Sequence, residues 1–232
     1  MKTHFTSIDH FFRGAFSVDI VIITYNNNDL HFLLEKKSET PFENTFGLPG
    51  SLILPNENTD QAINTICKKA VGINQFYTKQ LRAFSDIDRH PLGRVISFAY
   101  YGLIPFEKAK INDTKNYKWV KISNITELPY DHNKIVNHVI KRFKKGLLRH
   151  PNVFELMAEE FTLSEVIHVY ETTFNRKIDH SNFGKQIKTS ELIEPLEKKR
   201  GNSNKTGRPA QLYKFNKTKY KVNKKDKIQF NF

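Results

Sequence analysis

The hydrophobic and polar positions in the first part of the chain predict a β-sheet. Residues 17–37 contain two apolar runs separated by four polar residues, Asn26, Asn27, Asn28 and Asp29. Asparagine and aspartate tolerate the left-handed backbone of tight turns, so this pattern predicts a β-hairpin. Further apolar or alternating runs predict strands at 81–84, 94–104 and 117–122.

Two segments between or after these strands have the periodicity of helices. In residues 57–73, ENTDQAINTICKKAVGI, one stripe is apolar, Asn58 or Thr59 can cap the start, and Gly72 can end the helix. The apolar stripe contains Ala62, Ile63, Ile66, Cys67, Ala70 and Val71. Residues 133–147 show a similar stripe. Strands with interposed helices predict an α/β (α+β) layered domain, which we place at residues 1–148.

The remaining residues, 149–232, predict a second domain with a different plan. We expect a short helix at 153–161, a second helix opened by a capping box of Thr162 and Glu165, and a third at 180–189. Two short apolar runs, 191–196 and 211–216, then flank a basic, glycine-containing loop. Three helices followed by a β-hairpin with a basic tip predict a winged helix-turn-helix domain.

The net charge of +13 is concentrated in this second domain. Residues 1–175 contain 21 Lys and Arg against 19 Asp and Glu, whereas residues 176–232 contain 16 against 5. A field of one sign on a folded segment attracts polyanions, of which nucleic acid is the commonest in cells. The single cysteine cannot form an internal disulfide, and no apolar run approaches the length of a membrane span. We therefore expect a cytoplasmic protein without a membrane partner.

The predicted third helix has a polar outer face that suits the major groove of double-stranded DNA. Amide and cationic side chains match the donors and acceptors on base edges, and basic residues of a wing can meet phosphates. The alternatives are an ordinary solvated face, or RNA binding through the basic C-terminal tail. The predicted DNA-binding residues are Ser181, Asn182, Lys185, Gln186 and Lys188 on the helix, and Lys198, Lys199, Arg200, Lys205 and Arg208 in the wing.

Residues 51–73 resemble the Nudix box, the loop-helix-loop of hydrolases that act on nucleoside diphosphates linked to another moiety. The positions of the family's glycines, arginine and glutamates fall on Ser51, Glu57, Thr65, Ile66, Lys69, Ala70 and Gly72. Hard divalent cations need carboxylate oxygens, and only Glu57 retains one here. The degenerate box therefore predicts a domain without catalytic residues, metal ions or cofactors.

Three other stretches resemble parts of Nudix-related proteins. Residues 86–104, DIDRHPLGRVISFAYYGLI, resemble a strand entry of ADP-ribose-type Nudix proteins, and residues 128–136, LPYDHNKIV, resemble the segment that opens their final helix. Residues 206–215, TGRPAQLYKF, resemble the wing of Nudix-related transcriptional regulators. The resemblance implies a homodimeric repressor or activator that binds operator DNA. Its Nudix-like domain would sense a sugar or nucleotide-sugar, either a pentose such as arabinose or ADP-ribose.

The polar residues around DRHPLGR are the candidates for this effector site. We nominate Asp88, Arg89 and Arg94, with Lys36 behind them; the alternative is an ion-pair cluster that braces the loop. A hydrolase of ADP-ribose-like compounds is the alternative function, and it predicts turnover that depends on Mg²⁺. Three histidines, His31, His132 and His138, lack the spacing of metal ligands, so we expect structural or surface roles for them. We expect Cys67 to lie in the core.

Overall fold

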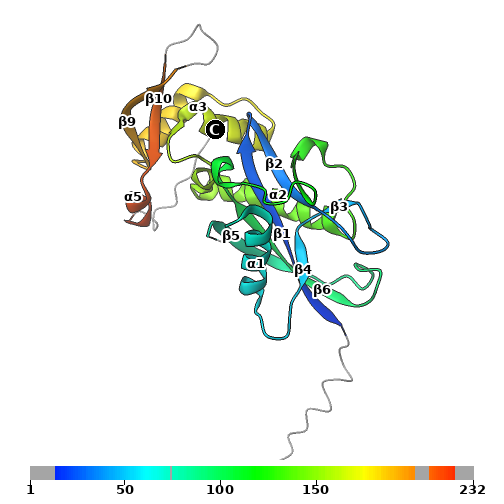
Figure 1. Ribbon diagram of the computed structural model, residues 1–232. Coiled ribbons are helices and arrows are strands. Elements are labelled where there is room, and N and C mark those ends of the chain that lie inside the picture. Colours follow the sequence, from blue (N-terminus) through cyan, green and yellow to red (C-terminus); the bar gives the residue numbers. More distant parts are fainter. Residues whose placement is uncertain (1–13, 74, 202–208, 223–232) are drawn as a thin grey trace, which may run out of the picture.

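In the computed structural model, residues 14–73, 75–201 and 209–222 are described, and the first of its two parts is built on a mixed seven-stranded sheet (Figure 1). The strand order is β3-β2-β1-β6-β5, with β4 paired to β1 and β7 paired to β2. β1 and β6 run parallel, and the other pairs in this sheet are antiparallel. The strands are β1 (Ala15–Asn26), β2 (Asp29–Lys36), β3 (Phe46–Gly47), β4 (Gly50–Leu52), β5 (Tyr77–Phe84), β6 (Val95–Leu103) and β7 (Tyr117–Lys121).

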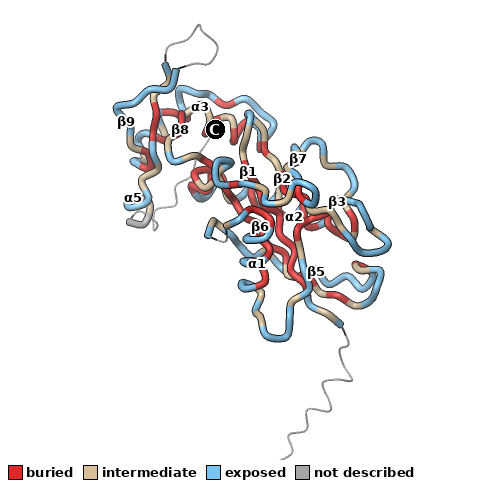
Figure 2. Tube along the Cα trace, in the orientation of Figure 1, coloured by how far each residue is buried: buried red, intermediate tan, exposed pale blue. Residues whose placement is uncertain are grey.

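The predicted hairpin is confirmed as β1 and β2. The turn residues Asn27 and Asn28 have φ angles of 49° and 62°, in the left-handed region that asparagine tolerates better than most residues. Along β1, residues 17–24 are all buried, because the strand lies in the middle of the sheet and both of its faces are covered. The buried centre of this sheet is visible as red tube in Figure 2.

Helices α1 (Thr59–Val71) and α2 (His132–Arg149) cover opposite faces of the sheet. α1 packs with the even-numbered core residues of β1, such as Ile20 and Ile22, and α2 packs with Val21 and Ile23. This division follows from the alternation of side chains along a strand. The apolar stripe predicted for α1 is confirmed: its six members are the buried residues of the helix.

The ends of α1 are set by local chemistry. The side chain of Asn58 accepts a hydrogen bond from the backbone N–H of Gln61, and Gln61 returns one to the backbone of Asn58, which completes a capping box. At the other end Gly72 has a φ of 76° and donates its N–H to the carbonyl of Lys68. Asn58, rather than Thr59, is therefore the cap.

The second part of the chain is a winged helix, as predicted. Its small sheet has the order β8-β10-β9, and α3 begins at the predicted capping box of Thr162 and Glu165. The elements are η4 (Asn152–Glu155), β8 (Phe161–Thr162), α3 (Leu163–Phe174), α4 (His180–Thr189), β9 (Ile193–Arg200), β10 (Ala210–Phe215) and α5 (Lys217–Val222). Two short 3-10 turns, η2 (Phe106–Lys108) and η3 (Ile122–Asn124), complete the order.

Two details of the prediction for this part were wrong. The helix expected at 153–161 is only the short 3-10 turn η4, because Phe161 is extended and pairs with Tyr213 in the small sheet. The basic residues 198–200 were expected in a loop, but they continue β9, where Arg200 pairs with Ala210. In both places, pairing with β10 keeps the backbone in an extended conformation where the local sequence pattern had predicted a helix or a loop.

The two parts pack directly on each other. One hydrophobic cluster runs from Val21 and Phe32 of the large sheet to Tyr170 and Tyr213 of the winged helix. α2 ends at Arg149, beside the boundary that we propose between residues 148 and 149. Across the junction, Lys108 and Glu159 form an exposed ion pair at 3.4 Å. None of the helices in the described ranges is both long and apolar enough to cross a membrane.

Candidate functional site

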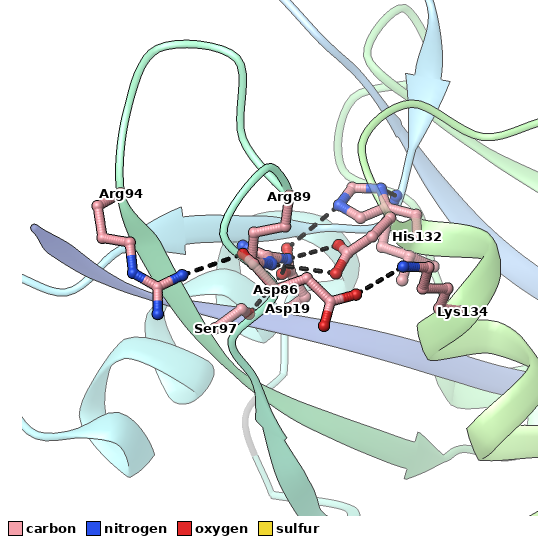
Figure 3. A network of polar contacts seen from close by, with 9 residues as sticks. Asp19, Asp86, Arg89, Arg94, Ser97, His132 and Lys134 are labelled. Atoms are coloured by element: carbon pink, nitrogen blue, oxygen red, sulfur yellow. Dashed lines mark hydrogen bonds and ion pairs between the residues drawn. The ribbon is translucent and has the colours of Figure 1, made fainter.

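A buried ion cluster lies where the loop between β5 and β6 meets the start of α2 (Figure 3). The guanidinium of Arg89 donates through Nε to Asp131 Oδ2 at 3.1 Å and through Nη2 to Asp131 Oδ1 at 2.7 Å. Nη2 also contacts Asp19 Oδ2 at 3.3 Å. Because the Arg89 side chain is only 3% exposed, these two carboxylates are the compensation for burying its charge.

The cluster continues through Asp19 to the loop before β4. His132 accepts the backbone N–H of Leu48 at its Nδ1, 3.0 Å away, so its Nε2 carries the proton that faces Asp19 Oδ1 at 3.5 Å. Ser97 also donates its hydroxyl to Asp19. Burial by itself would raise the pKa of Asp19, but the interaction with His132, the hydroxyl of Ser97 and the charge of Arg89 hold it well below its usual range.

This cluster leaves no room for a side chain at Gly50. A Cβ atom there would lie 2.3 Å from Asp19 Oδ1 and 2.8 Å from the carbonyl oxygen of Val18. Glycine is therefore needed for the close approach of β4 to β1. The cluster joins β1, the loop before β4, the loop before β6 and the N-terminus of α2.

Of the four predicted effector residues, two brace the β5–β6 loop. Arg89 lies in the buried cluster, and Arg94 donates through Nη1 to the carbonyls of Ser85 at 2.8 Å and Asp86 at 3.1 Å. Figure 3 shows Arg94 pointing across the base of the loop. This geometry matches the alternative of a bracing cluster. Lys36 lies on β2 and does not line the pocket beside this loop.

Asp88 is exposed and lines a pocket of about 560 Å³ on the outer side of the cluster. The ring of Tyr130 stacks on His90 with centroids 5.1 Å apart and contacts Phe42 at 4.4 Å. The pocket combines carboxylates, cations and aromatic rings, which are groups that can orient a polar ligand. Its lining is Phe42, Asp86, Ile87, Asp88, Arg89, Pro91, Tyr130, Asp131 and Lys134.

The degenerate Nudix box has structural contacts along α1 and the loop before it. Ile66 and Ala70 are buried at 6% and 0% exposure in the core under the helix. Glu57 accepts the backbone N–H of Leu54 at 2.8 Å, and Thr65 donates to the carbonyl of Gln61 at 3.1 Å. Ser51 lies in β4 opposite Val18, and Gly72 ends the helix.

Lys69, the remaining box residue, reaches a carboxylate that sequence reasoning missed. Its Nζ lies 3.4 Å from Glu35 Oε1 on β2, and the hydroxyl of Tyr117 donates to the same oxygen at 2.6 Å. The Nζ of Lys37 contacts Glu35 Oε2 at 3.2 Å and the carbonyl of Leu48 at 2.7 Å. Burial would raise the pKa of Glu35, but Lys37, Tyr117 and Lys69 together lower it.

Metal ligation and thiol chemistry have little support in the described part of the chain. There, no group of three or more His, Cys, Asp or Glu side chains is arranged to hold a metal ion. Cys67 is 1% exposed, and burial raises the pKa of its thiol to about 12, so it is a core residue as expected.

α4 presents the predicted polar face. Phe183 and Ile187 are buried, as expected for its inner side. Asp179 caps the helix by accepting the backbone N–H groups of Ser181 at 2.9 Å and Asn182 at 3.0 Å. Of the five nominated residues on α4, Ser181, Asn182, Lys185 and Lys188 are exposed and Gln186 is half-buried.

The turn before α4 is held by Glu171 at the end of α3. Its carboxylate accepts the backbone N–H of Ile178 at 3.1 Å and faces His180 Nε2 at 3.4 Å and Lys177 Nζ at 3.6 Å. Asn175, in the turn, has a φ of 50°. These contacts fix the direction in which α4 leaves α3, which no local pattern in the sequence indicates.

Ion pairs hold the base of the wing against the start of α3. Arg200 Nη1 lies 2.7 Å from Glu165 Oε1, its Nη2 donates to the carbonyl of Glu160 at 2.9 Å, and Lys198 Nζ lies 3.0 Å from Glu160 Oε1. Lys199, which is exposed, occupies the intervening strand position. Arg200 and Lys198 thus brace the wing against the start of α3. Lys205 and Arg208 lie outside the described residues.

Comparison with known proteins supports both halves of this architecture. Residues 153–215 match the family model described as the NrtR DNA-binding winged helix domain. The ADPR-responsive transcriptional repressor NtrR of Acinetobacter baylyi is 24% identical over 213 residues, which are 89% of this chain and 84% of the relative. A crystal structure of Shewanella oneidensis NrtR with a 27mer DNA is 25% identical, with a TM-score of 0.79 over 87% of this chain and 93% of that one.

The first domain by itself has a further relative. The ADP-ribose pyrophosphatase of Methanocaldococcus jannaschii is 29% identical over 137 residues, which are 59% of this chain and 78% of the relative. The fold and sites therefore define a two-domain protein in which a Nudix-like α/β domain precedes an NrtR-type winged helix. Across both domains and in their order the chain is a homologue of NrtR, which is consistent with the Nudix-related transcriptional regulators.

Proposed function

We propose that this protein is an ADP-ribose-responsive transcriptional repressor. Its winged helix binds double-stranded operator DNA, and its Nudix-like domain senses the effector. The observation that carries the proposal is the match of both domains, in the same order, to a repressor described as responsive to ADPR and to an NrtR structure that contains DNA. The relatives named above support ADP-ribose as the effector, and none of them is described with a pentose.

The DNA-binding half of the proposal rests on the exposed face of α4. Lys185, Lys188 and Asn182 point away from the buried Phe183 and Ile187, so this face is available to a groove. Lysine neutralises phosphates, and amide side chains read base edges. The large excess of positive charge after residue 175 favours the same partner.

We also propose that the protein acts as a homodimer. A two-fold symmetric dimer would present two copies of α4 to half-sites about one turn of DNA apart. ADP-ribose would regulate binding if it favoured one dimer geometry over the other, since a ligand with equal affinity for both states shifts nothing.

The effector half is proposed for the pocket beside Asp88. Its aromatic rings, Tyr130 and Phe42, can contact a base, and its carboxylates can accept hydrogen bonds from ribose hydroxyls. The pocket adjoins the buried Arg89 cluster, which links the β5–β6 loop to α2. α2 leads directly into the winged helix. A ligand that contacts the β5–β6 loop can therefore influence the winged helix through α2.

The test has two steps. DNA selected from a random duplex library with the full-length protein would be labelled, and binding followed by fluorescence anisotropy at fixed salt. We expect micromolar ADP-ribose to release the DNA, whereas ribose, arabinose and AMP at equal concentration leave it bound. Failure to select any sequence would contradict the DNA-binding half, and release by arabinose alone would contradict the choice of effector.

A hydrolase is the second candidate function, because the first domain resembles an ADP-ribose pyrophosphatase. We propose that hydrolysis is absent, since Ile66 and Ala70 provide no oxygen ligands and Lys69 carries a positive charge. Incubation of ADP-ribose with the protein and Mg²⁺ or Mn²⁺ decides between them. Formation of AMP and ribose phosphate at ordinary enzyme rates would favour the hydrolase.

A further inference from the structure

The Glu35 cluster consists of Glu35, Lys37, Lys69, Tyr117 and the carbonyl group of Leu48. It connects β2, β7, α1 and the loop before β4. Glu35 and Lys37 are each 13% exposed, whereas Lys69 is 70% exposed and lies with its Nζ 6.0 Å from the centre of the Tyr117 ring. The cluster thus has a buried part, formed by Glu35 and Lys37, and one solvent-facing cation.

The oxygens of this cluster are of the kind that ligate hard divalent cations. Such cations bind carboxylate and backbone carbonyl oxygens, and Glu35 and Leu48 offer one of each. Here, however, every one of these oxygens contacts an ammonium group: Lys37 bridges Glu35 and Leu48, and Lys69 contacts Glu35.

The helix side of the cluster supplies no further ligands. The box positions Ile66 and Ala70 are apolar and buried, and Lys69 is the third. A divalent cation would have to displace Lys69 from Glu35 while remaining close to Lys37, at a large electrostatic cost. The residues present therefore do not fit the metal ions that Nudix hydrolases hold with the glutamates of their box.

A cation is nevertheless favoured at this place. Lys68 and Lys69 lie in the last turn of α1, where the helix dipole is negative and stabilises positive charge. Glu35 adds a full negative charge across from that turn. Lys69 satisfies both with a charge that is covalently attached to the helix.

We propose that Lys37 and Lys69 are tethered cations that take the place of the divalent metal of Nudix hydrolases, so that this domain binds a diphosphate-containing effector without metal. The proposal rests on the function proposed above. Lys37 is occupied by Glu35 and Leu48 and has a structural role. Lys69, exposed and 3.4 Å from Glu35, is the cation that meets the phosphates of the ligand. It does not line the pocket beside Asp88, so we place the diphosphate at the Glu35 cluster and leave the base and ribose to that pocket. The two places are joined through Leu48, whose carbonyl contacts Lys37 and whose N–H contacts His132.

The first test needs no effector. Binding of Mn²⁺ to the full-length protein would be followed by loss of the free-ion signal in electron paramagnetic resonance. We expect that the wild type has no Mn²⁺ site that depends on Glu35, so Glu35→Gln should leave Mn²⁺ binding unchanged. Lys69→Glu should create a Mn²⁺ site that Glu35→Gln abolishes in the double variant. A Glu35-dependent site in the wild type, or no gain of binding in Lys69→Glu, would overturn the proposal.

The second test measures ADP-ribose affinity by calorimetry in EDTA and in millimolar Mg²⁺. We expect the wild-type Kd to agree within about twofold between the two conditions, and Lys69→Gln to weaken binding about tenfold in both, as expected for loss of a charged hydrogen bond. Lys68→Gln, which changes another exposed lysine on the same turn, is the matched control and should bind as the wild type does.

The outcomes of this second test separate the two proposals. Affinity that falls tenfold or more in EDTA, or an unchanged Kd in Lys69→Gln, would contradict recognition of the diphosphate by the tethered cation. Absence of ADP-ribose binding under every condition would contradict the proposed function instead. In that case the Mn²⁺ measurement would still decide whether the lysines stand in place of a metal ion.

Discussion

Arg89 contacts both carboxylate oxygens of Asp131, although 42 residues separate them in the chain. The pair is buried, with side-chain exposures of 3% and 6%. Removal of one partner of such a pair leaves the other charge buried without compensation, which costs about 3–5 kcal/mol. We therefore expect Arg89→Ala to lower the free energy of unfolding by about that amount, as measured by urea denaturation followed by circular dichroism.

A nearby exposed pair provides the control for this measurement. Lys134 and Asp86 lie 2.6 Å apart beside the same loop, but their side chains are 65% and 64% exposed. Solvent screens such pairs, so Lys134→Ala should leave the urea midpoint almost unchanged. Equal effects of the two substitutions would show that the Arg89 cluster does not hold the β5–β6 loop.

The lowered pKa of Asp19 predicts a dependence of stability on pH. Its carboxyl has an ordinary value of 3.8 in the unfolded chain and a lower one in the fold, where burial is outweighed by His132, Ser97 and Arg89. The stabilisation is therefore complete above the unfolded value and is lost as pH falls from there toward the folded value. Each such group contributes a slope of up to about 1.4 kcal/mol per pH unit in that window.

Asp19→Asn should reduce this slope. We expect the unfolding free energy of the variant to be lower than that of the wild type at neutral pH, and the difference to shrink as pH falls from about 4. Urea titrations at pH 3 to 7 would measure it. Glu127→Gln, which removes an exposed carboxylate, serves as control. A difference that stays constant or grows toward low pH would be inconsistent with an ionised Asp19 in the fold.

Lys185 on α4 tests the proposed DNA surface. Lys185→Ala should weaken binding to the selected duplex and, if the contact is to phosphate, reduce the slope of log affinity against log salt by about 1. Lys79→Ala on β5 removes the same charge from the other domain and should have little effect. Anisotropy titrations at four salt concentrations would measure both. Equal losses in the two variants would point to net charge alone.

Tyr170 tests the junction between the domains. The carbonyl of Leu147 lacks its usual helical donor, because the residue four positions later is Pro151, and the Tyr170 hydroxyl donates to it at 3.1 Å. Since Tyr170 is fully buried, Tyr170→Phe leaves this carbonyl without that donor and should cost about 1–3 kcal/mol in urea unfolding.

The control for the junction is Tyr213→Phe in the winged helix. The structure shows no hydrogen bond from the Tyr213 hydroxyl to any residue of the described ranges, so its removal should cost less. If Tyr213→Phe were as destabilising as Tyr170→Phe, loss of the Leu147 bond would not explain the effect.

Much of the fold was predictable because its signals are local. The Asn-rich turn after β1, the cap and stop of α1, and the capping box of α3 each depend on residues within four positions of one another. The buried stripes of α1 and α4 follow from helical periodicity. Where a long-range partner decided the backbone, as for Phe161 opposite Tyr213, the local interpretation failed.

The candidate sites were predictable only in part. The resemblance to the Nudix box drew attention to Lys69, and the DRHPLGR stretch drew attention to Arg89. Their partners could not be found in this way, because Glu35 is 34 residues from Lys69 and Asp19 is 70 residues from Arg89. A single sequence shows which residues are charged, but not which of them the sheet brings together.

The sequence by itself determined the order of the two domains, the polar face of α4 and the loss of carboxylates from the degenerate box. Tertiary structure decided that Arg89 and Arg94 brace a loop, that Arg200 braces the wing, and that Lys69 meets Glu35. The physical reason is that the local pattern specifies which face of an element is buried. In the first domain, the parallel pairing of β1 with β6 and the packing of α1 and α2 on opposite faces then decide which charged side chains meet.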